Sequence, residues 1–245
     1  MSRFFAEKYN VGDSTIVIDR RDDIHHIKNV LRLKEGDEIE ISDSETWEYR
    51  TEIIRISDSE VEVKILDKQT FAREPNLKVT LFQGVPKQGK METIVQKCVE
   101  LGVFQIVPVF MDRSVIVNNG NYWKKIVRYR KVADEAAKQC RRGVLPEISH
   151  EIDFKLLINN IVKYELVLFP YENENKRTIK GCLRNLQRTP KSVAIIIGPE
   201  GGFSDSEATT LKQVGAECVS LGKTILRTET AGMTALAMTM YELEL

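Results

Sequence analysis

Residues 193–214 read VAIIIGPEGGFSDSEATTLKQV, and this stretch decides the class of the fold. The apolar run at 193–197 is typical of a strand that is buried on both faces of a sheet. The adjacent Gly201 and Gly202 predict a turn in which the backbone can approach a ligand closely, because no Cβ intervenes. Ser204 and Glu207 form a capping-box pattern, which predicts that a helix begins directly after the turn. A strand, a glycine turn and a helix together form the repeating unit of a parallel α/β sheet.

The same alternation extends on both sides of this stretch. Apolar runs lie at residues 79–84, 104–110, 165–170 and 218–222, and helical patterns lie at 91–101, 123–142, 177–186, 205–214 and 230–243. Near-continuous apolar strands between helices favour a parallel sheet that helices cover on both faces. We therefore expect an α/β domain over residues 73–245.

The first 70 residues have a different pattern, with short segments in which apolar and polar residues alternate. These segments lie at 15–18, 38–41, 51–56 and 61–65, and residues 22–33 repeat apolar side chains at helical spacing. Such a pattern is typical of a small β-barrel with one short helix. The polar, proline-containing residues 68–76 predict a linker. We expect a separate N-terminal domain over residues 1–72.

Charge is distributed unevenly between these two parts. The chain of 245 residues has 36 basic and 36 acidic residues and a net charge of zero, which argues against a uniformly basic nucleic-acid binder. Residues 1–72, however, have 11 basic and 17 acidic residues, a net charge of −6, so residues 73–245 have a net charge of +6. This asymmetry indicates two parts with different roles.

Several classes of protein and site are excluded or disfavoured. No apolar run approaches the length of a transmembrane helix, and the first ten residues lack a secretory signal core, so we expect a cytoplasmic protein without a membrane segment. The four cysteines are widely spaced, and we interpret them as buried free thiols. The three histidines form no metal-ligating pattern, so we expect no metal.

Three predicted strand ends have unusual sequences, at residues 169–172, 198–202 and 221–232. Ligands of open α/β sheets bind at the carboxyl ends of the strands, so these segments are the candidate site. Dinucleotide binding is disfavoured, because the glycines at 198, 201 and 202 do not follow the G-x-G-x-x-G spacing. The Gly222–Lys223 pair resembles the end of a phosphate-binding loop, but Glu217 stands where that motif needs glycine.

Charged side chains near these segments are the remaining candidates. Arg227 and Glu229 lie just before the last predicted helix, where a cation and a carboxylate could flank a ligand; a surface ion pair is the alternative. Residues 124–142 have eight basic and two acidic residues, which favours either a phosphate-contacting helix face or an ordinary solvated one. The candidate phosphate contacts in this part of the chain are Lys87, Lys90, Arg113, Lys124, Arg128, Arg141 and Arg142.

Taken together, these motifs resemble those of one family. The segments HHIKNVLRLKEGDEIEISD, GVPKQGKMETIVQKCVELGV, IVPVFMDRSV, IGPEGGFSDSEA and LGKTILRTETAGMTAL occur in the order found in the RsmE family and cover nearly the whole chain. Members of that family are 16S ribosomal RNA uracil-N3 methyltransferases of the SPOUT class. The resemblance implies a PUA-like N-terminal barrel that binds RNA and an α/β domain that ends in a trefoil knot. Nothing in the spacing or periodicity reveals the knot.

The resemblance also implies an activity and a site. The expected reaction is S-adenosylmethionine-dependent methylation of N3 of a specific uridine in 16S ribosomal RNA of the small subunit, by a cytoplasmic homodimer without metal. The expected cofactor-binding residues are Leu168, Phe169, Pro170, Gly198, Pro199, Glu200, Gly202, Leu221, Gly222, Ile225, Leu226, Arg227, Thr230 and Ala231. We expect Arg227 to stabilise the developing anion or hold the cofactor's carboxylate, and Glu229 to act as the base or to orient Arg227. In the N-terminal domain, Arg3, His26 and Arg32 are expected to contact RNA.

Three other interpretations remain open. A non-catalytic RNA-binding factor could retain the fold, although it would not need the glycine-rich and LRTETA segments. An enzyme of the same class could methylate another RNA, such as transfer RNA. A small-molecule α/β enzyme would leave the basic helix and the N-terminal domain unexplained. The apolar stripe of the last helix, formed by Met233, Leu236, Ala237 and Met240, suits either a dimer interface or the core.

Overall fold

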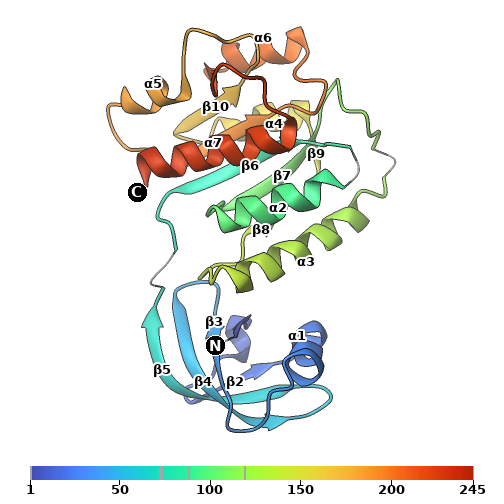
Figure 1. The fold of residues 1–245 in the computed structure, drawn as a ribbon, viewed down its shortest axis with the longest axis vertical. Coiled ribbons are helices and arrows are strands. Elements are labelled where there is room, and N and C mark those ends of the chain that lie inside the picture. The colour runs from blue at the N-terminus through green and yellow to red at the C-terminus, as the bar shows by residue number, and fades with distance from the viewer. Residues whose placement is uncertain (1, 72–73, 88, 119, 245) are drawn as a thin grey trace. The chain divides into compact units, whose positions relative to one another are not determined.

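A computed structural model describes residues 2–71, 74–87, 89–118 and 120–244. The chain forms two compact units, each built around its own sheet (Figure 1). The first unit contains residues 1–74 and 137–145, and the second contains residues 75–136 and 146–245. Residues 137–145 thus pack within the first unit, a feature that the sequence pattern does not reveal.

The first unit is built on a five-stranded sheet with the strand order β1-β3-β4-β5-β2. The strands are β1 (Arg3–Phe5), β2 (Thr15–Ile18), β3 (Glu38–Ser42), β4 (Trp47–Ile56) and β5 (Val61–Thr70). β1 pairs with β3 in parallel, and the other neighbours are antiparallel. The short helices are η1 (Lys8–Asn10), α1 (Arg21–His25) and the π-helical turn η2 (His26–Val30). Alternate strand residues such as Ile16, Ile39 and Ile53 are fully buried in its core.

The strand pattern of this unit is confirmed in outline, and several predicted limits are wrong. β4 begins earlier and β5 continues further than predicted, so residues 68–70 of the expected linker belong to a strand. Residues 72–73 of that linker lie outside the described residues. The predicted helix over 22–33 ends at Val30 and changes to π-helical hydrogen bonding at His26. β1 was not predicted, because three residues are too few to establish an alternation.

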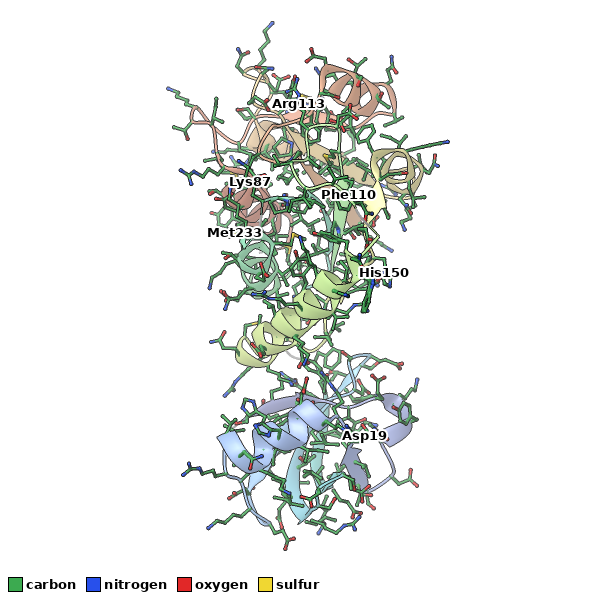
Figure 2. All side chains as sticks on the ribbon, turned by 90° about the vertical axis from the view of Figure 1, so that its right-hand side faces the viewer. Asp19, Lys87, Phe110, Arg113, His150 and Met233 are labelled. Carbon is green, nitrogen blue, oxygen red and sulfur yellow. The ribbon has the colours of Figure 1, made fainter. Side chains whose placement is uncertain are left out.

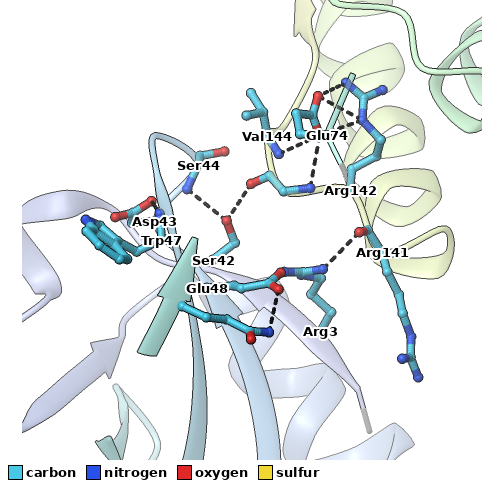
Figure 3. Close-up of polar contacts among 12 residues, drawn as sticks. Arg3, Ser42, Asp43, Ser44, Trp47, Glu48, Glu74, Arg141, Arg142 and Val144 are labelled. Atoms are coloured by element: carbon cyan, nitrogen blue, oxygen red, sulfur yellow. Dashed lines mark hydrogen bonds and ion pairs between the residues drawn. The ribbon is translucent and has the colours of Figure 1, made fainter. Parts of the chain in front are cut away.

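Polar contacts hold residues 141–143 in the first unit (Figure 3). The Arg3 guanidinium donates to the carbonyl oxygen of Arg141 at 2.9 Å. The Glu74 carboxylate accepts hydrogen bonds from Nε of Arg142 at 3.0 Å and from the amide of Gly143 at 3.1 Å. Arg142 is buried, and its charge is therefore compensated inside the unit.

The second unit is built on an entirely parallel sheet with the order β12-β10-β11-β6-β7-β8, and β9 also pairs with β7. The strands are β6 (Lys78–Gly84), β7 (Gln105–Phe110), β8 (Glu147–Ile148), β9 (Ile152–Asp153), β10 (Leu166–Pro170), β11 (Ser192–Ile197) and β12 (Glu217–Val219). The helices are α2 (Lys90–Glu100), α3 (Trp123–Gln139), α4 (Phe154–Ile161), α5 (Ile179–Arg184), α6 (Asp205–Gln213) and α7 (Thr228–Leu243). The expected fold class, a β domain followed by an α/β domain with a parallel sheet, is confirmed.

Helices cover both faces of this sheet, as the apolar runs predict. On one face, Phe82 and Ile196 pack in a common core with side chains of α4 and α6. On the other face, α7 lies across β6 and β11 and contacts α2 and α5 (Figure 1). Within the apolar stripe of α7, Leu236 and Met240 are buried and Met233 and Ala237 are partly buried. Core packing therefore accounts for half of the stripe.

Two predictions about helices in this unit need correction. α3 ends at Gln139, and Arg141 has a φ of +58°, in the left-handed region that terminates a helix. The expected helix over 123–142 is therefore wrong at its C-terminal end, and Arg142 does not share the exposed face that includes Lys124. α4 was not predicted; its start is capped by the Asp153 carboxylate, which accepts from the amide of Leu156 at 2.7 Å.

Candidate functional site

A cavity of about 530 Å³ lies at the carboxyl ends of β10, β11 and β12. Its walls are residues 170–172 after β10, residues 197–203 after β11 and residues 220–228 after β12, with Lys90 and Ala231 completing it. The structure thus brings together the three segments that the sequence singles out, which are far apart along the chain. Its volume lies in the range of pockets that hold small molecules and cofactors.

The segment after β11 can take its position only because Gly84, at the end of β6, has no side chain. A Cβ added to Gly84 would lie 2.5 Å from the backbone nitrogen of Pro199, closer than real Cβ contacts allow. On the other side of the turn, Gly202 has a φ of +68°, and a Cβ there would lie 2.8 Å from the carboxylate of Glu172. Gly84 therefore lets β6 approach the backbone of the turn after β11, and Gly202 leaves room for the Glu172 side chain.

Thr228, the first residue of α7, fixes the relative positions of two cavity segments. Its hydroxyl donates to the carbonyl oxygen of Gly198 at 2.6 Å and accepts from Nε2 of Gln83 at 2.8 Å. Thr228 and Gln83 are both buried, so water cannot readily replace these partners. The polar chain thus connects β6, the turn after β11 and the start of α7.

The turn after β11 is also anchored where it enters α6. Ser204 and Glu207 form the predicted capping box, with the Ser204 hydroxyl 3.2 Å from the amide of Glu207. The buried Glu207 carboxylate additionally accepts from the amide of Asp112 at 2.9 Å, at the end of β7. These contacts fix the helix start that follows the glycines.

A group of charged side chains lies at one side of the cavity. The Lys90 ammonium lies 3.0 Å from a carboxylate oxygen of Glu200 and 3.0 Å from one of Glu229. Hydrogen bonds to Glu200 and Glu229 raise the pKa of Lys90 above its ordinary value. Burial raises the pKa of Glu229, but its own backbone amide and the Lys90 ammonium outweigh burial and leave that pKa below its ordinary value. Arg227, which is exposed and lines the cavity, further lowers the pKa of Glu229.

Most of the expected cofactor-binding residues line this cavity. The lining members of that set are Pro170, Gly198, Pro199, Glu200, Gly202, Leu221, Gly222, Ile225, Leu226, Arg227 and Ala231. Leu168 and Phe169 are instead fully buried in β10, and Thr230 is an exposed residue of α7 outside the lining set. Other lining residues lie in or beside the three segments and are not among the expected cofactor-binding residues: Tyr171, Glu172, Ile197, Gly201, Phe203, Ser220, Lys223, Thr224 and Thr228.

The residues expected to contact RNA fall into three groups. Arg3 and Arg142 are buried, and both form ion pairs within the first unit. Lys90 lines the cavity and faces two carboxylates. The exposed or partly exposed members are His26, Arg32, Lys87, Arg113, Lys124, Arg128 and Arg141.

Two of the exposed members lie beside the turn after β11, and both are labelled in Figure 2. The backbone amide of Lys87 donates to the Glu200 carboxylate at 3.0 Å, which leaves its ammonium at the surface. The Arg113 guanidinium donates to the carbonyl oxygen of Gly201 at 3.1 Å. Lys87 and Arg113 thus place positive charge next to the cavity.

The four cysteines are free: Cys98, Cys182 and Cys218 are buried and Cys140 is partly buried. Among the described residues, no group of three His, Cys, Asp or Glu side chains is placed to hold a metal ion. In the same part of the chain, no helix has the length and apolar character needed to cross a membrane.

Comparison with known families identifies both units. Residues 73–240 match the model of the RNA methyltransferase domain family, and residues 18–66 match the model of the RNA methyltransferase PUA domain. The chain is 32% identical over 251 residues to ribosomal RNA small subunit methyltransferase E of Bacillus subtilis (strain 168), a match that covers 100% of this chain and 98% of the relative. Ribosomal RNA small subunit methyltransferase E of Mesomycoplasma hyopneumoniae (strain 232) is 30% identical over 95% of this chain and 96% of its own.

Solved structures agree with these matches over nearly the whole chain. A ribosomal RNA small subunit methyltransferase E from Neisseria gonorrhoeae, bound to S-adenosyl methionine, superimposes with a TM-score of 0.87 at 26% identity and covers 98% of this chain and 97% of its own. A putative methyltransferase from Legionella pneumophila, in complex with the same cofactor, has a TM-score of 0.85 at 30% identity and covers 98% and 96%. From these matches over both units, we conclude that the chain belongs to the RNA methyltransferase family that includes ribosomal RNA small subunit methyltransferase E.

Proposed function

We propose that this protein transfers a methyl group from S-adenosylmethionine to N3 of a specific uridine in 16S ribosomal RNA of the small ribosomal subunit. The observation that carries the proposal is the cavity at the ends of β10, β11 and β12. In two solved relatives that match this chain over 98% of its length, the bound molecule is S-adenosylmethionine. The RNA substrate is taken from the names of the full-length relatives.

The residues around the cavity suit S-adenosylmethionine, which combines a purine nucleoside with a charged amino-acid tail. Ile225 is 83% exposed although it is aliphatic, and it lines the cavity with Leu226, so both can cover an apolar ring. A Cβ added to Gly222 would meet nothing within 4 Å, which leaves room beside its backbone. Arg227 and Glu172 provide one positive and one negative group for the charged tail.

The chemistry of the reaction assigns tasks to the residues of the cavity. Bound S-adenosylmethionine supplies an electrophilic methyl group on a sulfonium. N3 of uracil must lose its proton before its lone pair can form the bond to that methyl group, while the bond between carbon and sulfur breaks. Arg227, exposed at the cavity wall, stabilises the negative charge of the deprotonated ring. Holding the two reacting groups together in the correct geometry lowers the barrier further.

Glu229 is better suited to orient Arg227 than to remove the N3 proton. Its carboxylate is engaged by the Lys90 ammonium at 3.0 Å, and its pKa is lowered despite burial. A carboxylate with a low pKa is a weak base toward a weakly acidic N–H group. The proposal therefore gives Glu229 the orienting role and leaves the proton to solvent or to the RNA.

RNA binding is proposed to use the first unit together with the exposed basic residues of the second. His26 and Arg32 are exposed in the first unit, and Lys124 and Arg128 are exposed on α3. Because residues 1–72 have a net charge of −6, the first unit would recognise the shape of folded RNA and not its bulk charge. The target base must also leave its stack to present N3.

We also propose that the protein acts as a homodimer in the cytoplasm, where ribosomal subunits are assembled. Beyond the family resemblance, support comes from α7, on which Met238 and Tyr241 are exposed although they are large and partly apolar. Such side chains are common in interfaces between subunits.

The proposal is tested by methyl transfer from labelled S-adenosylmethionine to small ribosomal subunits that lack uracil-N3 methylation, beside free 16S RNA and transfer RNA. Label in the RNA of the subunit supports the proposal. Label in transfer RNA alone would retain the cofactor and change the substrate. Failure to bind S-adenosylmethionine would favour a non-catalytic RNA-binding factor instead.

A further inference from the structure

Lys90 occupies a position that helix electrostatics disfavour. It is the first residue of α2, where the positive end of the helix dipole repels a cation. The nearest compensation comes from outside the helix, because its ammonium lies 3.0 Å from Glu200 and 3.0 Å from Glu229. The position of Lys90 is therefore better explained by these two carboxylates than by the stability of α2.

The two carboxylates come from different segments, and of the two only Glu200 lines the cavity. Glu200 lies in the turn after β11, and Glu229 lies in the first turn of α7, two residues after Arg227. All three charged side chains are partly buried, with 28% of the Lys90 side chain and 19% of each carboxylate side chain exposed. Both carboxylates approach one nitrogen atom, so they would lie close together with uncompensated charge if that nitrogen were absent.

We infer that Lys90 is a positioning residue of the methyl-transfer reaction, one that holds the turn after β11 and the start of α7 in register at one side of the cavity. This inference rests on the proposed function and replaces the expectation that Lys90 contacts RNA phosphate. Through Glu229, Lys90 keeps the backbone around Arg227 in place. Through Glu200, whose carboxylate also accepts from the amide of Lys87 at 3.0 Å, it fixes the turn after β11.

The first test needs neither RNA nor turnover. Hydrogen exchange of the free protein is measured for the wild type and for Lys90→Met, with Lys97→Met as the matched control. Lys97 lies on the same helix and pairs with Glu100 at 2.9 Å, outside the cavity lining. Faster exchange of amides in 198–203 and 228–232, in Lys90→Met alone, is the expected result. Unchanged exchange in both segments would overturn the inference.

The second test separates positioning from binding. For Lys90→Met, kcat on small subunits is expected to fall by about 10–100-fold, since small displacements of reacting groups have effects of this size. KM for RNA should change much less, and Lys90→Arg should recover most of the lost rate. A raised KM for RNA with an unchanged kcat would show that Lys90 contacts RNA, and would overturn the inference. A wild type without methyl transfer would contradict the proposed function, and the exchange experiment would still decide the role of Lys90.

The third test uses pH, because the ionisation of Glu200 and Glu229 affects kcat only if the two carboxylates serve the methyl-transfer site. The charged groups that face the Lys90 ammonium are Glu200 and Glu229, and Arg227 faces Glu229. In Lys90→Met, the two carboxylates repel, so one of them should bind a proton at a higher pH than in the wild type. The acidic limb of the kcat profile should therefore move to higher pH, and adding Glu200→Gln should move it back. An acidic limb that stays at the wild-type pH would contradict the inference.

Discussion

The hydroxyl of Thr228 donates a hydrogen bond of 2.6 Å to the carbonyl oxygen of Gly198, 30 residues earlier in the chain. This contact joins the first residue of α7 to the turn after β11, so two walls of the cavity share one buried hydrogen bond. Nε2 of Gln83 completes the link to β6 at 2.8 Å. The segments around the cavity are thus connected by neutral hydrogen bonds at Thr228 and by the ion pairs of Lys90.

Replacing Thr228 with valine should destabilise the second unit. The change removes the hydroxyl that donates to the Gly198 carbonyl and leaves Nε2 of Gln83 with only the carbonyl oxygen of Gly84, at 3.1 Å. Loss of these buried hydrogen bonds costs about 1–3 kcal/mol of the free energy of unfolding. Urea unfolding of the purified variant measures this loss. Thr228→Ser keeps the hydroxyl and should lose far less; a loss in Thr228→Ser without a loss in Thr228→Val would show that the methyl group of Thr228, and not its hydroxyl, is important.

Adding a methyl group at Gly84 should displace the turn after β11. The new Cβ would lie 2.5 Å from the nitrogen of Pro199, and overpacking of this kind costs about 1–3 kcal/mol. Calorimetric titration of Gly84→Ala with S-adenosylmethionine should show weaker binding than the wild type. Gly181→Ala is the control, since its Cβ would approach the Thr178 hydroxyl only to 3.2 Å. Wild-type affinity in Gly84→Ala would mean that the turn does not bind the cofactor.

Arg227→Ala should lose turnover and keep its fold. Arg227 is exposed at the cavity wall, so its removal leaves no buried gap, while loss of one stabilising donor typically lowers kcat by about 10²–10³-fold. Thermal unfolding and methyl transfer are measured together for this variant. Arg188→Ala, which removes an arginine whose side chain is 82% exposed and pairs with Glu165 at 3.7 Å, is the control and should remain active. Full activity in Arg227→Ala would remove Arg227 from the mechanism.

Lys124 and Arg142 lie near the two ends of the basic segment 124–142, and replacing them should affect different properties of the protein. Arg142→Gln removes the partner of Glu74 in the first unit and should cost about 1–3 kcal/mol of stability. Lys124→Gln should leave stability within about 0.5 kcal/mol, because Lys124 is exposed. RNA binding of Lys124→Gln should weaken, and the slope of log K against log salt should fall by about 1 if one phosphate contact is lost. An unchanged slope would exclude Lys124 from the RNA-binding surface.

The contrast between Lys124 and Arg142 shows where sequence periodicity fails. Helical spacing predicts one face for both residues, but this holds only while the helix continues, and Arg141 leaves it with a φ of +58°. No local pattern predicts that the next residue, Arg142, pairs with Glu74, 68 positions earlier. Strand positions were more predictable, because continuous apolar runs such as residues 193–197 have few alternatives once helices flank them.

The candidate site likewise has one part that the sequence predicts and one part that it does not. Its backbone was predictable, since glycines and polar residues at three strand ends must meet at one edge of a parallel sheet. The ion pairs of the site could not be predicted, because the sequence around a lysine at the start of a helix does not indicate which carboxylates its ammonium contacts. The sequence predicts an RNA contact for Lys90, and the structure shows its ammonium 3.0 Å from Glu200 and from Glu229. Sequence patterns predict where backbone segments lie, whereas the partners of long charged side chains depend on contacts that form only in the folded chain.

The most direct test of the account is the identity of the methylated nucleoside. Small subunits that lack uracil-N3 methylation are incubated with the wild-type protein and S-adenosylmethionine, and their 16S RNA is digested and analysed by mass spectrometry against synthetic standards. The account predicts N3-methyluridine at a single position, absent from reactions with Arg227→Ala. Methylation at carbon 5 of uracil, at the ribose 2′-hydroxyl or at another base would contradict it.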